Sequence, residues 1–311
     1  MKILMTGSSG FIGSHMTPKL EKNFKLYHLK SDLLDFDNVV DEVNNINPDI
    51  IVHLAARTEV EKSFYEQLTF SQINYTGSVN LIEAAAKLKN VYFVFASTME
   101  VYGWQPISDE IKQGHIPDII PAFDELTPAN PNAPYAVAKY GVEKYLEYAQ
   151  RALGLDYAII RQTNSYGRKD NNFFATEQIV WQMLTNPYEC NLGYANPYRN
   201  FIFIDDLLEA WEVIISNRDK CANNIFTLGP DYAVQIQNHA ATIANMLDWK
   251  GIINWDTKLK RPGEIYLLNS NSNKLTSLTG WAPKVSYNEG LLLTINYWKE
   301  IIKNNDSIKQ S

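Results

Sequence analysis

Three side chains near the middle of the sequence carry the groups needed for acid–base chemistry on an alcohol. Tyr135 and Lys139 lie four residues apart at the start of an expected helix, so both project from one face. A phenol with a pKa of about 10 is a poor base until a nearby cation stabilises the phenolate. Lys139 could supply that charge, and Thr98, at the end of an expected strand, could hydrogen-bond the same oxygen. The set predicts proton transfer at a hydroxyl group while hydride leaves the same carbon.

Two further side chains follow Thr98 in the stretch ASTMEVYG. Glu100 could remove a proton from carbon, or it could be a structural or solvated carboxylate, and the sequence leaves both open. Met99 has no proton to give and cannot be a general acid. The strand end therefore offers a base without an acid beside it.

A glycine-rich turn near the first residue could bind a pyrophosphate. TGSSGFIG stands between an expected strand and an expected helix, and its glycines recur at every third position. Glycine permits the tight turn and close approach of the backbone, and the helix N-terminus offers free N–H groups. An ordinary strand–helix turn is the alternative, but this context favours a dinucleotide site. The residues expected to bind the cofactor here are Gly7, Ser9, Gly10, Phe11, Ile12 and Gly13.

The second expected strand lacks the acidic residue that usually hydrogen-bonds the adenosine ribose. Lys30 stands near its end, followed by Ser31 and Asp32. A lysine there could pair with a 2′-phosphate, so NADP is possible beside NAD. A merely solvated Lys30 is equally compatible with the sequence.

The elements that must position these residues alternate between short apolar runs and helical patterns, as in a parallel sheet covered by helices. Strands are expected at KILMTG, KLYHL, DIIVHLAA, VYFVFAST and DYAIIR, and helices at FIGSHMTPKLEK, NYTGSVNLIEAAAKLK and YAVAKYGVEKYLEYAQRAL. Right-handed crossovers then give an α/β fold with a doubly wound parallel sheet of the Rossmann type. NFIFIDDLLEAWEVII returns to strand and helix and is expected to rejoin that sheet.

Two regions are expected along the chain. Residues 1–166, with about 201–228, form the NAD(P)-binding Rossmann domain. Residues 167–200 and 229–311 form a smaller substrate-binding lobe. The long proline-rich connection 103–134 is expected to be functional or to wrap a neighbouring element.

Composition narrows the partners and the compartment. The chain has 311 residues, 45% hydrophobic and 20% charged, with a net charge of −7 and no long basic run, so nucleic acid is not an expected partner. No apolar run reaches the roughly 20 residues of a membrane helix. Cys190 and Cys221 lack metal-ligand spacing and a disulfide framework, so no metal is expected. These features predict a soluble cytoplasmic protein.

With these motifs together, the chain resembles the extended short-chain dehydrogenase/reductases of the NAD-dependent nucleotide-sugar epimerase/dehydratase family. The resemblance covers nearly the whole chain and rests on TGSSGFIG, DIIVHLAA, NYTGSVNLIEAA, STMEVYG, DELTPANPNAPYAVAK, RQTNSYG, YRNFIFIDDLLEA and RPGE. It implies an enzyme that acts on a nucleotide-diphosphate sugar with NAD. It also implies a homodimer through a four-helix bundle, here formed by the helices after Asn74 and Tyr135.

The resemblance also implies roles for individual residues. Thr98, Tyr135 and Lys139 would be catalytic, with Glu100 as a candidate base. The cofactor would be bordered by Lys30, Asp32, Leu33, Leu54, Ala55, Ala56 and Asn74, in addition to the glycine loop, Tyr135 and Lys139. The substrate would be held by Thr58, Asn164, Arg199 and Arg261, the arginines gripping the diphosphate with their forked guanidinium groups. Asn200 departs from the family's usual aspartate, and Arg168 from its usual proline.

Several reactions remain open at this point. An epimerase that oxidises the sugar at C4 needs only Thr98, Tyr135 and Lys139, and is favoured. Similar 4,6-dehydratases carry Thr-Asp-Glu at this strand end, so Met99 removes their usual acid. An NADPH-dependent reductase of a 4-keto-6-deoxy sugar is suggested by Lys30 and by TNSYGRKDNNF, with Lys169 where related synthases have a histidine. A non-enzymatic nucleotide-binding protein would not need the three catalytic residues together.

Overall fold

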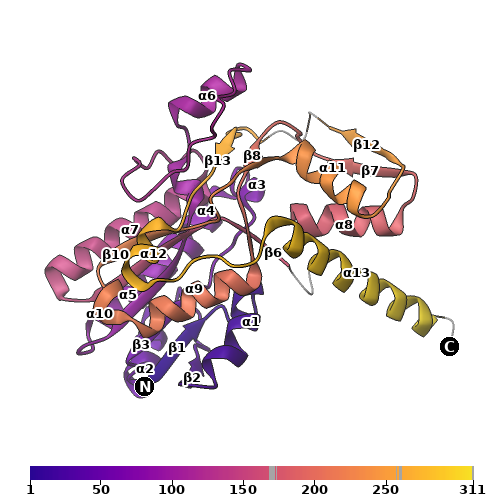
Figure 1. Cartoon of the computed structure of the whole chain (residues 1–311). Coiled ribbons are helices and arrows are strands. Elements are labelled where there is room, and N and C mark those ends of the chain that lie inside the picture. Colours follow the sequence, from indigo (N-terminus) through magenta and orange to yellow (C-terminus); the bar gives the residue numbers. More distant parts are fainter. Residues whose placement is uncertain (168–171, 173, 257, 259–260, 310–311) are drawn as a thin grey trace.

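A computed structural model of the chain describes residues 1–167, 172, 174–256, 258 and 261–309, with the backbone alone for 305–309. Six strands form the central sheet in the order β10-β5-β4-β3-β1-β2, and every neighbouring pair is parallel. These strands are β1 (Lys2–Thr6), β2 (Lys25–His28), β3 (Ile50–His53), β4 (Tyr92–Thr98), β5 (Asp156–Gln162) and β10 (Asn224–Leu228). The expected α/β fold with a doubly wound parallel sheet is confirmed (Figure 1).

Helices cover both faces of this sheet because its strands are apolar on both sides. Along β4, Phe93 and Phe95 pack toward one face, and Tyr92 and Val94 pack toward the other. The first face is covered by α2 (Phe36–Ile46), α5 (Gly77–Ala86) and α7 (Pro134–Leu153). The second is covered by α1 (Phe11–Leu20) and α9 (Ile204–Ser216). Burying each such large apolar side chain contributes about 1.5–3 kcal/mol, so this double core fixes the strand ends that carry the site.

One expected strand pairing is wrong. The segment 201–216 does form a strand and a helix, but β9 (Phe201–Phe203) pairs with β6 (Asn164–Tyr166) in a separate two-stranded sheet. The strand that rejoins the central sheet is β10, which follows α9 and the short α10 (Arg218–Cys221). A three-residue strand carries too little pattern to specify its partner.

The remaining elements lie mostly beyond the carboxyl ends of the central strands (Figure 1). They include two small sheets, ordered β11-β8-β13 and β12-β7. Their bounds are α8 (Ala175–Thr185), β7 (Glu189–Leu192), β8 (Tyr198–Arg199), β11 (Val234–Gln235), α11 (Ile236–Met246), β12 (Ile252–Trp255), β13 (Leu267–Leu268), α12 (Asn273–Thr279) and α13 (Tyr287–Lys309). The division of the chain into two domains stays a prediction.

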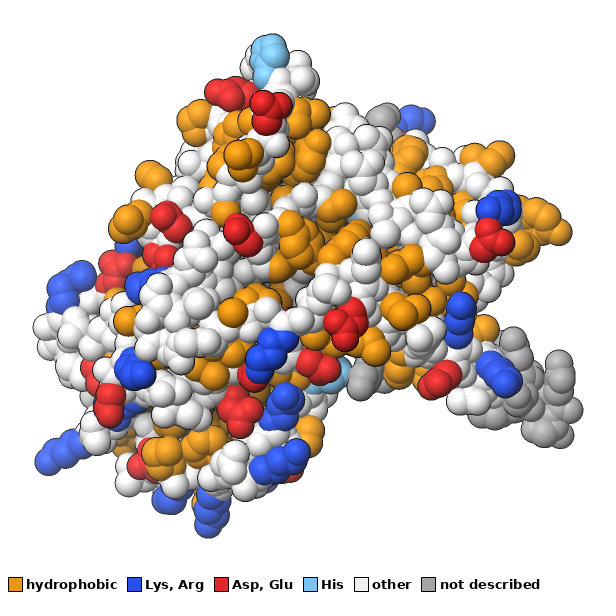
Figure 2. All heavy atoms as spheres, in the orientation of Figure 1, with side chains coloured by type: hydrophobic (Ala, Val, Ile, Leu, Met, Phe, Trp, Pro, Cys, Tyr) orange, Lys and Arg blue, Asp and Glu red, His pale blue; other side chains and the backbone are white. Residues whose placement is uncertain are grey.

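Shorter turns complete the chain. They are α3 (Val60–Ser63), α4 (Gln67–Ser71), a π-helical turn (Gln72–Thr76), a 3₁₀ turn (Met99–Tyr102) and α6 (Pro106–Lys112). The long connection 103–134 carries α6 outward at the top of Figure 1. Ser108 anchors it by accepting a hydrogen bond from the N–H of Tyr266 at 2.8 Å. Figure 2 shows apolar side chains gathered over this projection, where Ile116 and Ile119 are exposed.

Candidate active site

The predicted catalytic residues meet where β4 ends beside the first turns of α7. Thr98 is the last residue of β4, and Pro134 begins α7, a position where its fixed backbone suits a helix start. This places Tyr135 in the first turn, close enough to Thr98 for the threonine hydroxyl to lower the pKa of the phenol. The exposed fractions are 8% for Thr98, 9% for Glu100, 7% for Tyr135 and 2% for Lys139. The structure therefore brings the four side chains into one desolvated region.

Burial shifts the two groups expected to move protons or charge in opposite directions. Burial raises the pKa of Tyr135, and the negative charge of Glu100 raises it further, against the lowering effect of the Thr98 hydrogen bond. Burial lowers the pKa of Lys139 to about 7, although Glu143 opposes that shift. The phenol therefore holds its proton in the protein alone, and Lys139 is close to half protonated at neutral pH.

Lys139 is held by the strand that it faces. Its Nζ donates to the carbonyl oxygen of Ala96 at 2.8 Å and lies 4.7 Å from the ring centroid of Phe95. Both contacts favour the charged form of the lysine. They hold its ammonium against Ala96 of β4, two residues before Thr98. The lysine thus joins α7 to the strand that carries Thr98.

A buried ion pair behind these residues was not found from the sequence. Arg161 on β5 donates from Nε to Glu143 Oε1 at 3.1 Å and from Nη2 to Oε2 at 2.7 Å. Ser97 also donates to Glu143, and Arg161 reaches the hydroxyl of Tyr102 at 3.3 Å. Glu143 lies four residues after Lys139, so the same helix face that predicted the Tyr–Lys pair could have indicated it. The pair ties α7, β4 and β5 together beneath the site.

Met99 and Glu100 lie in different surroundings, although they are adjacent in sequence. Met99 is 2% exposed and packs in an apolar cluster with Tyr102, Ile111, Phe123, Ile265, Tyr266, Leu267 and Leu268. The Oε1 of Glu100 lies 3.7 Å from Nη1 of Arg261, and its charge acts on both Tyr135 and Arg199. The carboxylate therefore belongs to the site, whereas the thioether belongs to the core.

The glycine loop has the shape that a pyrophosphate cradle needs. Gly7 adopts φ +71°, and a Cβ there would lie 2.6 Å from the backbone nitrogen of Ala55. A Cβ on Gly13 would lie 2.2 Å from the carbonyl oxygen of Gly7. Helix α1 begins at Phe11 after Gly10, with no side chain capping its first N–H groups. These open donors and the glycine backbone fit the pyrophosphate of a dinucleotide.

Beside this loop, a line of hydrogen bonds holds the end of β3. The N–H of Ala55 donates to the Thr6 hydroxyl at 3.1 Å, and that hydroxyl lies 2.7 Å from Nδ1 of His53. Nε2 of His53 lies 2.8 Å from Ser78 Oγ, which itself donates to the carbonyl of Asn74. Burial lowers the pKa of His53 to about 3, with Lys139 adding to the effect, so this ring is neutral. Because Ser78 Oγ donates to Asn74, it must accept from Nε2 of His53, so Nε2 carries the imidazole proton. Nδ1 then accepts from the Thr6 hydroxyl.

Asn74 fixes the segment that includes the expected cofactor residues Leu54, Ala55 and Ala56. Its Oδ1 accepts from the N–H of Arg57 at 2.8 Å, and its Nδ2 donates to the carbonyl of Arg57 at 2.9 Å. Asn74 is fully buried, so both halves of its amide are used as a backbone clamp. Thr58, just beyond, is exposed, and its N–H contacts the carboxylate of Glu59 at 3.2 Å.

The expected adenosine end follows β2. Lys30 is exposed, and its N–H donates to Glu42 on α2 at 3.0 Å. Asp32 accepts from the N–H of Leu34 at 2.9 Å, and Leu33 packs in the core between α2 and α5. Glu42 is a charged residue that sequence reasoning missed, because it belongs to the following helix.

The two expected substrate arginines differ in their freedom. Arg199 is 8% exposed, and its Nη1 donates to the carbonyls of Tyr198 and Ile265. Its Nη2 donates to Glu264 at 2.7 Å. Burial lowers the pKa of Arg199 despite the opposing charges of Glu264 and Glu100, and Arg261 lowers it further. The Arg261 side chain is 35% exposed, so it is the more accessible of the two.

The other predicted positions are more scattered. Asn164 is exposed at the start of β6. Asn200 is fully buried. Its Nδ2 donates to the carbonyl oxygen of Pro230 at 2.6 Å and to Asn269 Oδ1 at 3.1 Å, so it links the segments that carry these two residues. Arg168 and Lys169 lie outside the described residues.

The described part of the chain offers neither a membrane-spanning helix nor a cluster of metal ligands. None of its helices combines the length and apolar character needed to cross a bilayer. No group of three or more His, Cys, Asp or Glu side chains within those residues could hold a metal ion.

Comparisons with known proteins agree with this geometry. A dTDP-D-glucose 4,6-dehydratase of Dictyostelium discoideum is 26% identical over 96% of this chain and 81% of its own length. The crystal structure of a UDP-glucose 4-epimerase from Thermotoga maritima with UDP-glucose superposes with a TM-score of 0.85 at 25% identity, covering 97% of this chain and 100% of that one. A UDP-glucose 4-epimerase of Thermus thermophilus in complex with NAD gives a TM-score of 0.83 at 22% identity, over 96% and 99% of the two chains.

A model of the NAD dependent epimerase/dehydratase family matches residues 3–229, which include the glycine loop, the strand end at Thr98 and the Tyr–Lys pair. That match spans most of the chain and both of its motifs. The protein therefore belongs to the NAD dependent epimerase/dehydratase family, a family of nucleotide-sugar enzymes with NAD as the cofactor.

Proposed function

We propose that the protein is a nucleotide-sugar epimerase that works through a transient 4-keto sugar. The observation that carries this proposal is the contrast at the end of β4. Thr98, Tyr135 and Lys139 share one buried region, whereas Met99 packs in the apolar core. The chain thus offers the groups for oxidation at an alcohol without the neighbouring acid that elimination of water requires.

In this proposal Tyr135 handles the proton of the C4 hydroxyl. NAD, when bound, would supply the hydride chemistry at C4. The phenolic oxygen of Tyr135 takes the hydroxyl proton and gives it back, so no proton or electron pair is lost over the cycle. Thr98 would hydrogen-bond the same oxygen, and the ammonium of Lys139 would favour the phenolate by its charge.

The proposed cofactor residues have separate tasks. The backbone of Gly7, Gly10 and Gly13 would hold the pyrophosphate at the start of α1. Leu54, Ala55 and Ala56 would line the site, on the segment that Asn74 clamps. Because β3 pairs with β4, these residues would lie beside the strand that carries Thr98.

A 4,6-dehydratase is the second candidate, and one observation favours it. Glu100 lies in the site, 3.7 Å from Arg261 and close enough to Tyr135 to influence its pKa. A carboxylate there could remove a proton from C5 of a 4-keto sugar. The dehydratase then needs an acid for the C6 hydroxyl from a source other than Met99.

Replacing Tyr135 tests the shared first step. Tyr135→Phe should lower turnover at least ~100-fold, the usual scale for losing a general acid–base group. Tyr140→Phe on the same helix removes a hydroxyl without touching the site and should leave turnover near wild type. Near-normal turnover of Tyr135→Phe would rule out the mechanism.

Replacing Glu100 separates the two candidates. Glu100→Gln keeps the shape of the side chain and removes its charge. An epimerase should retain most of its turnover, whereas a dehydratase should lose it by about 100-fold or more. A loss of turnover of that size in Glu100→Gln would favour the dehydratase over the epimerase.

A homodimer and a cytoplasmic location are also proposed. The bundle would use α5 and α7, and Val137 and Tyr148 on α7 are exposed apolar residues that such an interface would cover. Light scattering of the purified protein tests this assembly, and a monomeric mass would contradict it.

A further inference from the structure

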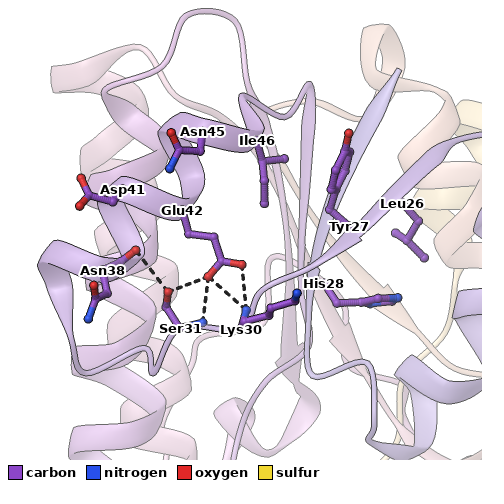
Figure 3. Close-up of a pocket in the computed structure, with 10 residues that line it drawn as sticks. All are labelled: Leu26, Tyr27, His28, Lys30, Ser31, Asn38, Asp41, Glu42, Asn45 and Ile46. Atoms are coloured by element: carbon purple, nitrogen blue, oxygen red, sulfur yellow. Dashed lines mark hydrogen bonds between the residues drawn. The ribbon is translucent and has the colours of Figure 1, made fainter.

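The open edge of the central sheet lies beside a hollow between a strand and the helix that follows it. β2 is the last strand of the sheet, and a hollow of about 610 Å³ lies between it and α2. Parallel pairing directs alternate N–H groups of an edge strand away from its neighbour. Leu29 donates to Met5 of β1, so the N–H of Lys30, one residue later, faces the hollow. Figure 3 shows this region with Glu42 at its centre.

The carboxylate of Glu42 occupies a small anion-binding nest at this edge. It accepts from the N–H of Lys30 at 3.0 and 3.2 Å and from the N–H of Ser31 at 2.8 Å. The hydroxyl of Ser31 donates to it at 2.6 Å. Two successive backbone N–H groups and a hydroxyl are the donors with which proteins commonly hold phosphate oxygens.

The charge of Glu42 is stabilised in this position. Burial works to raise the pKa of Glu42, but the hydrogen bonds from Ser31 and Lys30 outweigh it and lower the pKa. The carboxylate is therefore ionised at neutral pH. Figure 3 shows the Lys30 side chain extending toward His28, and its positive charge also helps to lower the pKa of Glu42.

The position of the nest along the chain relates it to the cofactor. In doubly wound folds, the residue about 20 positions after the glycine loop lies at the adenosine ribose, where an acid selects NAD and a basic residue accommodates a 2′-phosphate. Lys30 is 20 residues after Gly10. The sequence therefore places the cationic side chain of Lys30 at this point. The fold places the carboxylate of Glu42 against the backbone N–H of the same residue.

We propose that Glu42, supplied by α2, is the residue that sets the preference for NAD over NADP. A 2′-phosphate at the ribose end would need the donors of Lys30 and Ser31 that Glu42 already fills, and it would meet a like charge. With Glu42 removed, the same donors and the Lys30 ammonium form a phosphate site. The proposal concerns cofactor binding alone, so it stands whether the reaction is epimerisation or dehydration.

Cofactor affinities test the proposal without turnover. Protein freed of bound nucleotide is titrated with NAD⁺ and with NADP⁺ by calorimetry. Glu42→Gln should raise the affinity for NADP⁺ relative to NAD⁺ by at least about tenfold, because the like charge is gone. Asp41→Asn is the matched control, since Asp41 lines the same hollow, is exposed and carries the same charge. It should change the ratio by less than about twofold.

A double variant separates a phosphate site from a general loosening of the loop. Adding Lys30→Ala to Glu42→Gln should abolish the gain in NADP⁺ affinity, because the remaining cation is lost. An unchanged ratio in Glu42→Gln, an equal change in Asp41→Asn, or a gain that survives Lys30→Ala would each overturn the proposal.

Discussion

Two buried arginine–carboxylate pairs flank the site, and they differ in how completely their charges are matched. Arg161 and Glu143 lie beneath the predicted catalytic residues, and Arg199 is one of the predicted substrate residues and pairs with Glu264. Both pairs have a shortest N–O distance of 2.7 Å. Burial opposes the charge of each arginine, but the bonds and charge of Glu143 raise the pKa of Arg161 above its ordinary value. The pKa of Arg199 stays below its ordinary value.

This difference separates an arginine whose burial is fully offset by its partner from one whose burial is not. Glu143 receives two donors of Arg161 and the hydroxyl of Ser97, so the ion pair under the site is fully satisfied. Arg199 has Arg261 close enough to lower its pKa, and the two nearby carboxylates do not offset its burial. An incoming diphosphate would supply the missing negative charge. We therefore propose that the predicted catalytic half is built in advance and that the predicted substrate half would gain its missing charge from a bound diphosphate.

The largest expected effect comes from breaking the satisfied pair. Glu143→Gln leaves the guanidinium of Arg161 buried without its counter-charge, and such changes cost about 3–5 kcal/mol of unfolding free energy. Urea unfolding measures the loss. Glu147→Gln on the same helix removes a surface partner of Lys144 and should cost less than about 1 kcal/mol. Equal losses in the two variants would contradict the account.

A smaller effect is expected from the pH dependence of Lys139. Its pKa is about 7 in the folded protein against 10.5 ordinarily, so the unfolded chain binds more protons between those values. The free energy of unfolding should therefore rise with pH above about 7, by up to about 1.4 kcal/mol per pH unit. Below pH 7 the lysine is protonated in both states, and this contribution stays constant.

Lys139→Met removes that titration, so its stability should lack the rise between about pH 7 and pH 9. Lys144→Met, which replaces an exposed lysine of the same helix, should keep it. The comparison is made by urea unfolding at several pH values. Parallel curves for the wild type and Lys139→Met would show that the lysine is not held at a lowered pKa.

The smallest expected effect concerns the substrate pair. Glu264→Gln removes counter-charge from Arg199, so a diphosphate should bind more tightly, by roughly threefold to tenfold, or about 0.7–1.4 kcal/mol. Calorimetry with UDP measures this, and the affinity for NAD⁺ should not change. Weaker binding of UDP would mean that Glu264 holds Arg199 in place for the substrate instead of competing with it.

Local patterns predicted the parts of the site that depend on local spacing. The glycine loop, the strand ending at Thr98 and the pair Tyr135–Lys139 follow from strand and helix periods, and the structure has these elements where they were expected. The catalytic and binding roles themselves stay predictions.

The parts that escaped prediction join residues that no period relates. Glu42 reaches Lys30 across 12 residues, Arg161 reaches Glu143 across 18, and Arg199 reaches Glu264 across 65. Each contact joins two different elements of the fold, so it depends on how a helix or loop packs against a strand or loop elsewhere in the chain. The misplaced pairing of β9 has the same cause, because three residues cannot specify which strand lies beside them.

The most direct test of the central claim is the product. The protein is incubated with UDP-glucose and, separately, with dTDP-glucose, and the sugar is followed by proton NMR. The account predicts a change of configuration at C4, with the C6 hydroxymethyl group intact and no net consumption of NAD. A new C6 methyl signal with a carbonyl at C4 would show loss of water, and would contradict the claim that Met99 leaves the site without an acid.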